Sequence, residues 1–136
     1  MSGERGVVDT NVVVLFGGLA PESLPDQPVI TTITLAELAV GPLVAADPVR
    51  RARRQEHLRF AEESFPVLPF DEAAARAFGS VAAALRASGR KVSARGFDAL
   101  IAATALANDL PLFTTNADDF TAIDGLEVVA VAAPDR

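Results

Sequence analysis

The sequence predicts an α/β protein in which helices cover both faces of a mostly parallel five-stranded sheet. Short apolar runs alternate with longer segments of helical periodicity along the 136 residues. The runs are rich in Val, Ile, Leu and Phe, as is typical of strands that are covered on both faces. Regular alternation of strands and helices favours parallel strands joined by helical crossovers. We expect a single domain over residues 1–136.

Local signals place each element in order. Strands are expected at 6–9, 29–33, 65–70, 110–115 and 126–131. Capping residues and breakers predict helices from Thr10 or Asn11 to Gly17, from Thr34 to Gly41–Pro42, over 48–64, from Asp71 to Ser88–Gly89, from Ser93 to Asn108, and a short one after Asn116. In such sheets the ligand site lies beyond the carboxyl ends of the strands. Asp9 and Asn116 are predicted to lie there.

Composition excludes several functional classes. The chain has no cysteine, which excludes disulfides, thiolate zinc sites and cysteine nucleophiles. No apolar stretch approaches the roughly 20 residues of a spanning helix, and the N-terminus lacks a signal-peptide core. We therefore expect a soluble cytoplasmic protein without membrane contact. The net charge of -6 argues against capture of nucleic acid by the whole surface, although it permits local contact.

The positive charge is concentrated and is almost entirely guanidinium. Two clusters hold most of it: Arg50, Arg51, Arg53 and Arg54, and then Arg90, Lys91 and Arg95. Guanidinium groups pair well with phosphate or with carboxylates of a partner. The alternative is a solvated helix face. His57 is the sole histidine and lies in the same basic helix, so we expect a surface residue rather than a catalytic base.

Acidic residues from distant parts of the chain lie beside apolar runs. They are Asp9 in VVDTNVVV, Glu37 in TLAELAVG and Asp98 in GFDALIAATA. An isolated carboxylate is costly to bury, and converging carboxylates repel one another unless a cation lies between them. Oxygen-only ligands favour Mg²⁺ or Mn²⁺. The pattern therefore predicts a divalent-metal site.

Each of these residues also has a purely structural interpretation. Asp9 can cap the helix that follows it. Glu37 can close a capping box with Thr34. Asp98 can be a favourable carboxylate in the first turn of a helix, although the apolar residues three, four and seven positions later place it on a buried stripe.

A fourth polar segment, LFTTNADDF, follows a later strand. Asn116 can cap a short helix with Asp119 at the capping-box spacing, and Asp118 and Asp119 can be surface charges. The functional alternative is that Thr115, Asn116 and Asp119 line the same cleft as the other acidic residues.

In this order the four motifs resemble those of PIN-domain ribonucleases, and most closely the VapC toxins of bacterial toxin–antitoxin pairs. The resemblance covers essentially the whole chain, and DALIAATALANDLPLFTTNADDF is its most specific part. It implies a three-layer α/β/α fold and RNA cleavage that depends on Mg²⁺ or Mn²⁺. It also implies a homodimer and a cognate VapB-type antitoxin. We expect the antitoxin to bind a groove between the second, third and fourth helices.

The resemblance also assigns roles to residues by position. The implied catalytic residues are Asp9, Glu37, Asp98 and Asp119, with Asp9 and Asp98 as the principal metal ligands. The implied substrate contacts are Thr10, Thr115 and Asn116. Many PIN domains carry an aspartate at the position of Asn116, so here Asp119 would supply the missing charge.

Other classes fit less well. A receiver domain requires a lysine near the end of one of the last strands, but Lys91 precedes the penultimate strand and no lysine follows it. An aspartate-nucleophile phosphatase requires Asp-x-Asp after the first strand, where this chain has Asp-Thr-Asn. A PIN-like binding module without activity remains an alternative, and Asn116 is the residue that favours it.

Overall fold

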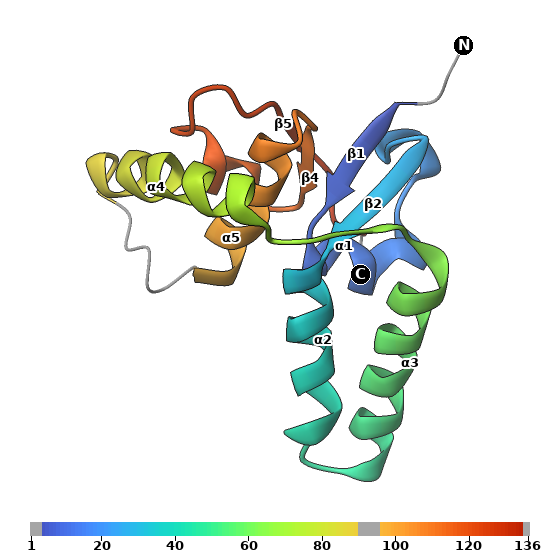
Figure 1. The fold of residues 1–136 in the computed structure, drawn as a ribbon. Helices are drawn as coiled ribbons and strands as arrows, with labels where there is room; N and C mark the ends of the chain where they lie inside the picture. Colours follow the sequence, from blue (N-terminus) through green and yellow to red (C-terminus); the bar gives the residue numbers. More distant parts are fainter. Residues whose placement is uncertain (1–3, 90–95, 135–136) are drawn as a thin grey trace.

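The computed structural model describes residues 4–89 and 96–134 (Figure 1). The strands are β1 (Arg5–Val8), β2 (Gln27–Thr31), β3 (Val67–Leu68), β4 (Leu112–Thr114) and β5 (Val128–Ala130). The α-helices are α1 (Thr10–Leu15), α2 (Thr32–Leu43), α3 (Pro48–Ser64), α4 (Glu72–Ala87) and α5 (Gly96–Ala107). Short 3₁₀ turns are η1 (Phe16–Gly18), η2 (Pro21–Ser23) and η4 (Ala117–Phe120).

The sheet has the strand order β3-β2-β1-β4-β5, and every strand pair in the described residues is parallel. From β1 the chain moves outward to β3 and then crosses back to β4 on the other side of β1. This reversal makes the carboxyl ends of β1 and β4 the switch point, where ligands bind in open α/β sheets. Asp9 follows β1 at that point, and its N–H donates to the carbonyl of Phe113 in β4 at 3.2 Å.

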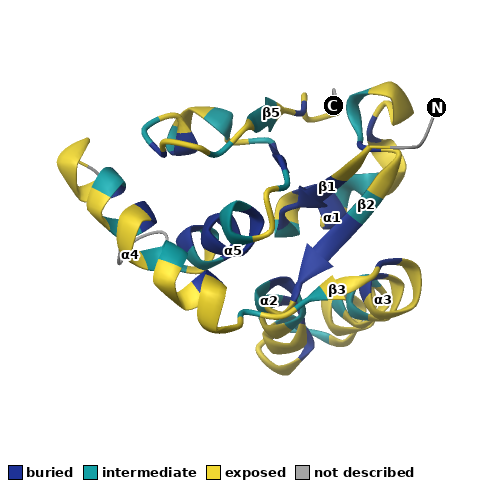
Figure 2. Ribbon diagram, turned by 45° about the horizontal axis from the view of Figure 1, so that its top comes forward, coloured by how far each residue is buried: buried dark blue, intermediate teal, exposed yellow. Residues whose placement is uncertain are grey.

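Apolar cores lie on both faces of the sheet. Successive residues of β1 point into opposite cores. Val7 packs with side chains of α4 and α5, and Val8 packs with side chains of α1 and α3. A Cβ at Gly6 would lie 2.5 Å from Cε1 of Phe113, so glycine allows this ring to cross β1. Figure 2 shows burial concentrated in β1 and α5, whereas much of α3 and α4 is exposed. The three-layer α/β/α architecture is confirmed.

Helices α3 and α4 begin and end close to the predicted residues. The carboxylate of Asp47 caps α3 through the Arg50 N–H at 2.9 Å, and that of Asp71 caps α4 through the Ala74 N–H at 3.0 Å. Each such cap is worth about 1 kcal/mol. Within residues 4–89 and 96–134, no helix combines the length and the apolar character needed to cross a bilayer.

The junction between β2 and α2 differs from the prediction. The strand was expected to continue to residue 33 because Val29, Ile30 and Ile33 belong to one short apolar run. Instead it ends at Thr31, whose hydroxyl accepts a hydrogen bond from the Thr34 N–H at 3.3 Å and caps α2. The other end also differs, because Pro42 lies inside the last turn of α2.

The later strands are shorter than the apolar runs that predicted them. Phe65, Leu110 and Leu126 lie in those runs, but they pack into the cores from outside the strands. Burial alone therefore made loop residues resemble strand residues. For the fifth helix, the structure gives Gly96–Ala107, and the predicted cap Ser93 lies outside the described residues.

Helices α2 and α3 pack side by side and project together away from the sheet (Figure 1). The rings of Phe16, Phe60 and Phe65 contact one another in tilted and edge-on arrangements, with centroids 5.3 to 5.8 Å apart. Such pairs contribute about 1 kcal/mol each beyond area burial. They fix the C-terminal half of α3 next to α1, while its N-terminal half extends along α2.

Candidate active site

Asp9 is held rigidly at the carboxyl end of β1 and is only 5% exposed. Its Oδ1 accepts a hydrogen bond from the Val12 N–H at 3.0 Å, so the helix-cap interpretation is confirmed. Burial raises the pKa of Asp9. Hydrogen bonds from the Thr114 side chain and the Val12 N–H oppose this shift, and the charge of Asp98 adds to it. The Asp9 carboxylate therefore both caps α1 and lies close enough to Asp98 to respond to its charge.

Glu37 lies on α2 and is partly buried. The Thr10 hydroxyl donates to its Oε1 at 2.5 Å and lies 3.1 Å from the Thr34 hydroxyl. The predicted capping box between Thr34 and Glu37 is wrong, because Thr31 caps α2 and Thr34 is already its third residue. Glu37 is thus available to groups outside its own helix.

The ionisation of Glu37 responds to the other two acidic residues. Burial raises its pKa, the hydrogen bond from Thr10 lowers it, and the charges of Asp98 and Asp9 raise it further. Like charges disfavour one another's ionised form at short range. Glu37 therefore lies close enough to both aspartates to respond to their charges.

Asp98 lies in the first turn of α5, where a carboxylate is favourable. The residues three, four and seven positions later are fully buried, as predicted: Ile101, Ala102 and Ala105. The charge of Asp98 adds to the raised pKa values of Asp9 and Glu37. Asp98 is therefore a favourable first-turn carboxylate of α5 and also a member of the acidic site. We call Asp9, Glu37 and Asp98 the acidic cluster.

The donor chemistry of the acidic cluster fits a hard divalent cation. Its ligands are all oxygen, and its burial and mutual repulsion disfavour the fully ionised state, which a cation would relieve. In the described ranges, no group of three or more His, Asp or Glu side chains is arranged to hold a metal ion by itself. Mg²⁺ commonly binds through one or two carboxylates and completes its shell with water and phosphate oxygens. A pair such as Asp9 and Asp98 meets that requirement.

Comparison with known proteins decides the family. The PIN domain model matches residues 6–126. Ribonuclease VapC5 of Mycobacterium tuberculosis is 40% identical over 129 residues, which cover 93% of each chain. Ribonuclease VapC4 of the same organism is 32% identical over 136 residues, covering 96% of this chain and 100% of the relative.

This chain belongs to the PIN-domain family.

Its similarity extends to solved structures within the VapC group. The crystal structure of VapBC-5 from Mycobacterium tuberculosis, a member of the VapBC family of toxin–antitoxin systems, superposes with a TM-score of 0.81. The sequences are 38% identical, and the match covers 93% of this chain and 98% of the other. The resemblance inferred from the motifs is confirmed, and the whole acidic cluster lies within the matched PIN domain.

The fourth segment of the PIN domain is arranged differently from the prediction. Asn116 precedes η4, but its side chain does not cap it. The predicted capping box is replaced by a backbone hydrogen bond from the Asp119 N–H to the Asn116 carbonyl at 3.0 Å. The raised pKa values of Asp9 and Glu37 arise from groups other than Asp119. The roles of Thr115, Asn116 and Asp119 stay predictions.

Two buried threonines of the PIN domain were not predicted to belong to the site. Thr34 and Thr114 are both 0% exposed. The Thr114 hydroxyl bonds to Asp9 and accepts the Asn116 N–H at 3.0 Å. Because β4 pairs with β1 through Val8 and Phe113, the next residue of β4 lies beside Asp9. That register is a long-range property, and Thr115 instead of Thr114 was the residue named from the sequence.

Proposed function

We propose that this chain is a VapC-type endoribonuclease toxin that hydrolyses RNA phosphodiester bonds at the acidic cluster. One observation carries the assignment of the site. Three carboxylates that are far apart in sequence come together at the switch point of the sheet: the charge of Asp98 adds to the raised pKa of Asp9, and the charges of Asp98 and Asp9 add to the raised pKa of Glu37. They do so in a chain that is 40% identical to a ribonuclease.

The division of roles follows from the environment of each carboxylate. Asp9 and Asp98 would hold Mg²⁺ or Mn²⁺, which polarises a phosphate and acidifies water when it is bound. Thr114 and the Val12 N–H fix the orientation of the Asp9 carboxylate. Asp98 lies in the first turn of α5. Preorganised ligands of this kind reduce the reorganisation needed when substrate binds.

Glu37 is the residue suited to orient the attacking water and take its proton. Its raised pKa makes it a better proton acceptor than an ordinary exposed glutamate. The Thr10 hydroxyl donates to Oε1 and holds the carboxylate in one orientation. We assign Thr115 and Asn116 to contacts with the substrate, and Asp119 to the catalytic charge that Asn116 does not supply.

The test is RNA cleavage by the purified chain in Mg²⁺. Asp9→Asn is the sharpest variant, because asparagine is also a good helix cap and α1 should remain folded. Activity should fall by about a thousandfold or more if Asp9 is a metal ligand. Asp124→Asn removes the same charge at an exposed residue outside the cluster and is the matched control. Cleavage by Asp9→Asn at the rate of this control would reject the site.

A PIN-like binding module without activity is the alternative function, and Asn116 favours it. Titration calorimetry with Mg²⁺ separates the two. A ribonuclease of the proposed kind should bind the ion in a manner that Asp98→Asn abolishes. A wild-type chain without measurable binding and without cleavage would support the inactive module.

The regulatory part of the proposal is a VapB-type antitoxin. It is supported by the likeness to the structure of VapBC-5, a member of a family of toxin–antitoxin systems. We propose that the antitoxin enters between α2, α3 and α4 and brings an arginine to the acidic cluster. Co-expression with the product of a short neighbouring reading frame should yield a complex that does not cleave RNA. Light scattering of the free chain tests the proposed homodimer.

A further inference from the structure

The inner face of α3 changes character halfway along the helix. Residues at spacings of three, four and seven face the same side of a helix and usually carry apolar groups toward a neighbour. In the C-terminal half this face is apolar and packs into the core: Leu58 and Ala61 mark it, and Phe65 continues it just after the helix ends. In the N-terminal half the same spacing carries Arg50, Arg53, Arg54 and His57.

This cationic stripe lines a groove of about 380 Å³. Seven residues at roughly 1.5 Å each give the stripe a length of about 10 Å. The opposite wall is formed by α1 and α2 and consists of Val14, Glu37, Leu38 and Gly41. We call this the α2–α3 basic groove. Because Glu37 belongs to both sites, the groove opens directly onto the acidic cluster.

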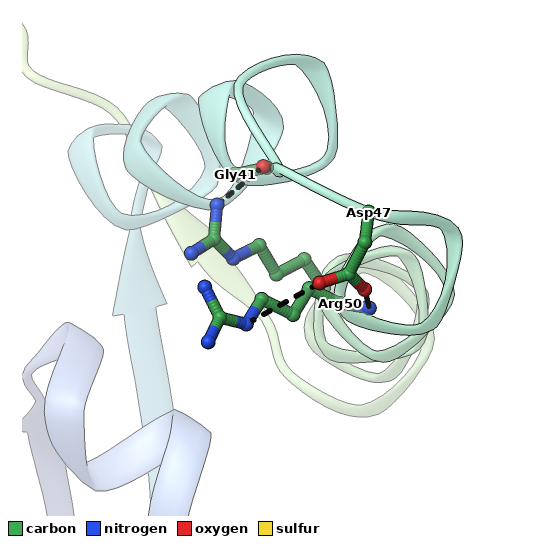
Figure 3. A network of polar contacts seen from close by, with 4 residues as sticks. Gly41, Asp47 and Arg50 are labelled. Atoms are coloured by element: carbon green, nitrogen blue, oxygen red, sulfur yellow. Dashed lines mark hydrogen bonds and ion pairs between the residues drawn. The ribbon is translucent and has the colours of Figure 1, made fainter.

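The arginines are partly fixed by their surroundings. Figure 3 shows the Arg50 guanidinium directed into the space between α2 and α3. The Arg54 Nη1 donates to the carbonyl of Gly41 at 3.0 Å, which fixes this guanidinium without cancelling its charge. A Cβ at Gly41 would lie 3.3 Å from the Arg54 Cδ, so glycine lets the arginine stem lie close against α2. The Arg50 Nε lies 3.7 Å from Asp47 Oδ2 in an exposed ion pair, and such pairs are weak in water.

We propose that the α2–α3 basic groove binds the phosphates of the RNA strand next to the bond that is cleaved, with Arg50 and Arg53 as the principal contacts. The inference rests on the proposed ribonuclease function and adds the path of the substrate. Guanidinium forks match phosphate oxygens in geometry and charge. Phosphate contacts of this kind are independent of sequence and position the strand.

Charge explains why such a groove is needed. The chain carries a net charge of -6, and the acidic cluster repels phosphate, so a strand requires local cations to approach it. An acidic segment of a protein partner would also suit arginines. We assign the groove to RNA because every nucleotide carries a phosphate for its arginines and because the groove leads to Glu37, where the proposed reaction cleaves a phosphodiester. The antitoxin proposed above would then compete with RNA for this region.

The test measures binding of fluorescein-labelled oligouridylate of about a dozen nucleotides by anisotropy, in EDTA so that no cleavage occurs. The variant is Arg50→Gln combined with Arg53→Gln. The affinity should fall about tenfold or more. The salt dependence should also weaken, by about 0.7 in log–log slope for each phosphate that the variant no longer neutralises.

Arg51→Gln combined with Arg59→Gln is the matched control. It makes the same change in net charge on the same helix, but neither residue lines the groove. Its RNA affinity should fall by much less than that of the groove variant. Equal losses in both variants, or unchanged affinity and salt slope in the groove variant, would overturn the proposal. A groove variant that loses antitoxin binding but retains RNA affinity would assign the groove to the protein partner instead.

Failure of this inference is distinguishable from failure of the proposed function. If wild type cleaves RNA in Mg²⁺ and the two double variants bind RNA alike, the function holds and the groove assignment fails. If wild type binds RNA through Arg50 and Arg53 but never cleaves it, the groove assignment holds and the nuclease assignment fails.

Discussion

The acidic cluster and the α2–α3 basic groove share Glu37, yet they are built in opposite ways. The cluster joins β1, α2 and α5, and its aspartate at β1 is almost fully buried. The groove takes its charge from one helix, and its cations are at least partly exposed to water. Long-range packing therefore brings together the charges of the first site, whereas local helical periodicity brings together those of the second.

This difference sets the energetics of the two sites. Burial and like charge raise the pKa values of Asp9 and Glu37, so the folded protein bears an electrostatic cost there. Exposed arginines are screened by salt and cost little. Variants of the cluster should therefore change stability and chemistry together. Variants of the groove should change RNA binding and its salt dependence.

Asp98→Asn should have the largest effect. It removes the charge that raises the pKa of both other carboxylates, and it removes a proposed metal ligand. RNA cleavage should fall by about a thousandfold or more. At the same time, relief of repulsion worth about 1 kcal/mol should raise the melting temperature without metal by about 2–4 °C.

The contrast with wild type is measured by thermal unfolding in EDTA and in Mg²⁺. Millimolar Mg²⁺ should stabilise wild type because it binds the folded state, and it should stabilise Asp98→Asn much less. A variant that is destabilised in EDTA, or that responds to Mg²⁺ as wild type does, would contradict the repulsion described for the cluster.

Thr114→Val should have an intermediate effect on the cluster. The Thr114 hydroxyl lowers the pKa of Asp9, so its removal should raise that pKa and shift the acid limb of the pH–activity profile to higher pH. We expect cleavage at neutral pH to fall about tenfold, as for the removal of other hydrogen bonds to charged groups. Thr115→Val is the control. A larger shift in Thr115→Val than in Thr114→Val would reverse the assignment of the two threonines.

The pH dependence of stability should show the smallest effect. The folded-state pKa values of Asp9 and Glu37 lie above the ordinary values of 3.8 and 4.5, so the folded protein takes up these protons before the unfolded chain does. In EDTA, protonation of these two groups should therefore raise the stability of the folded protein as the pH falls from neutral toward their pKa values. This contribution should disappear again as the pH rises through the folded-state pKa values.

This contribution is isolated by comparing wild type with the variant Asp9→Asn, Glu37→Gln. Melting temperatures of the two proteins should converge as the pH is lowered from neutral into the mildly acidic range, because protonation removes the repulsion that only wild type retains. Parallel curves over that interval would contradict the raised pKa values. The groove variant should follow wild type throughout.

Local patterns in the sequence were sufficient for much of the fold. The cap Asp71 and the run of residues 48–64 gave α4 and α3 almost to the residue. The junction at Thr31 was not predictable from the apolar run, because either Thr31 or Thr34 can cap a helix, and the packing of α2 on the sheet decides between them. Strand lengths were overestimated where buried loop residues continue an apolar run.

The candidate site shows the same division. The motifs around Asp9, Glu37 and Asp98 indicated the acidic cluster, and their mutual influence on ionisation agrees with it. Thr114 was missed because the choice between it and Thr115 depends on how β4 pairs with β1. The stripe of arginines was visible in the sequence, but its direction toward α2 depends on the aromatic contacts that orient α3.

The connection of β1, α2 and α5 at one point also has a consequence for synthesis of the protein. A ribosome delivers Asp9 and Glu37 long before Asp98 and β4, which pairs with β1 and supplies Thr114. The incomplete polypeptide holds only part of the acidic cluster, and its β1 lacks one of its two neighbours. The proposed active site can therefore form only after Asp98 and β4 have been synthesised.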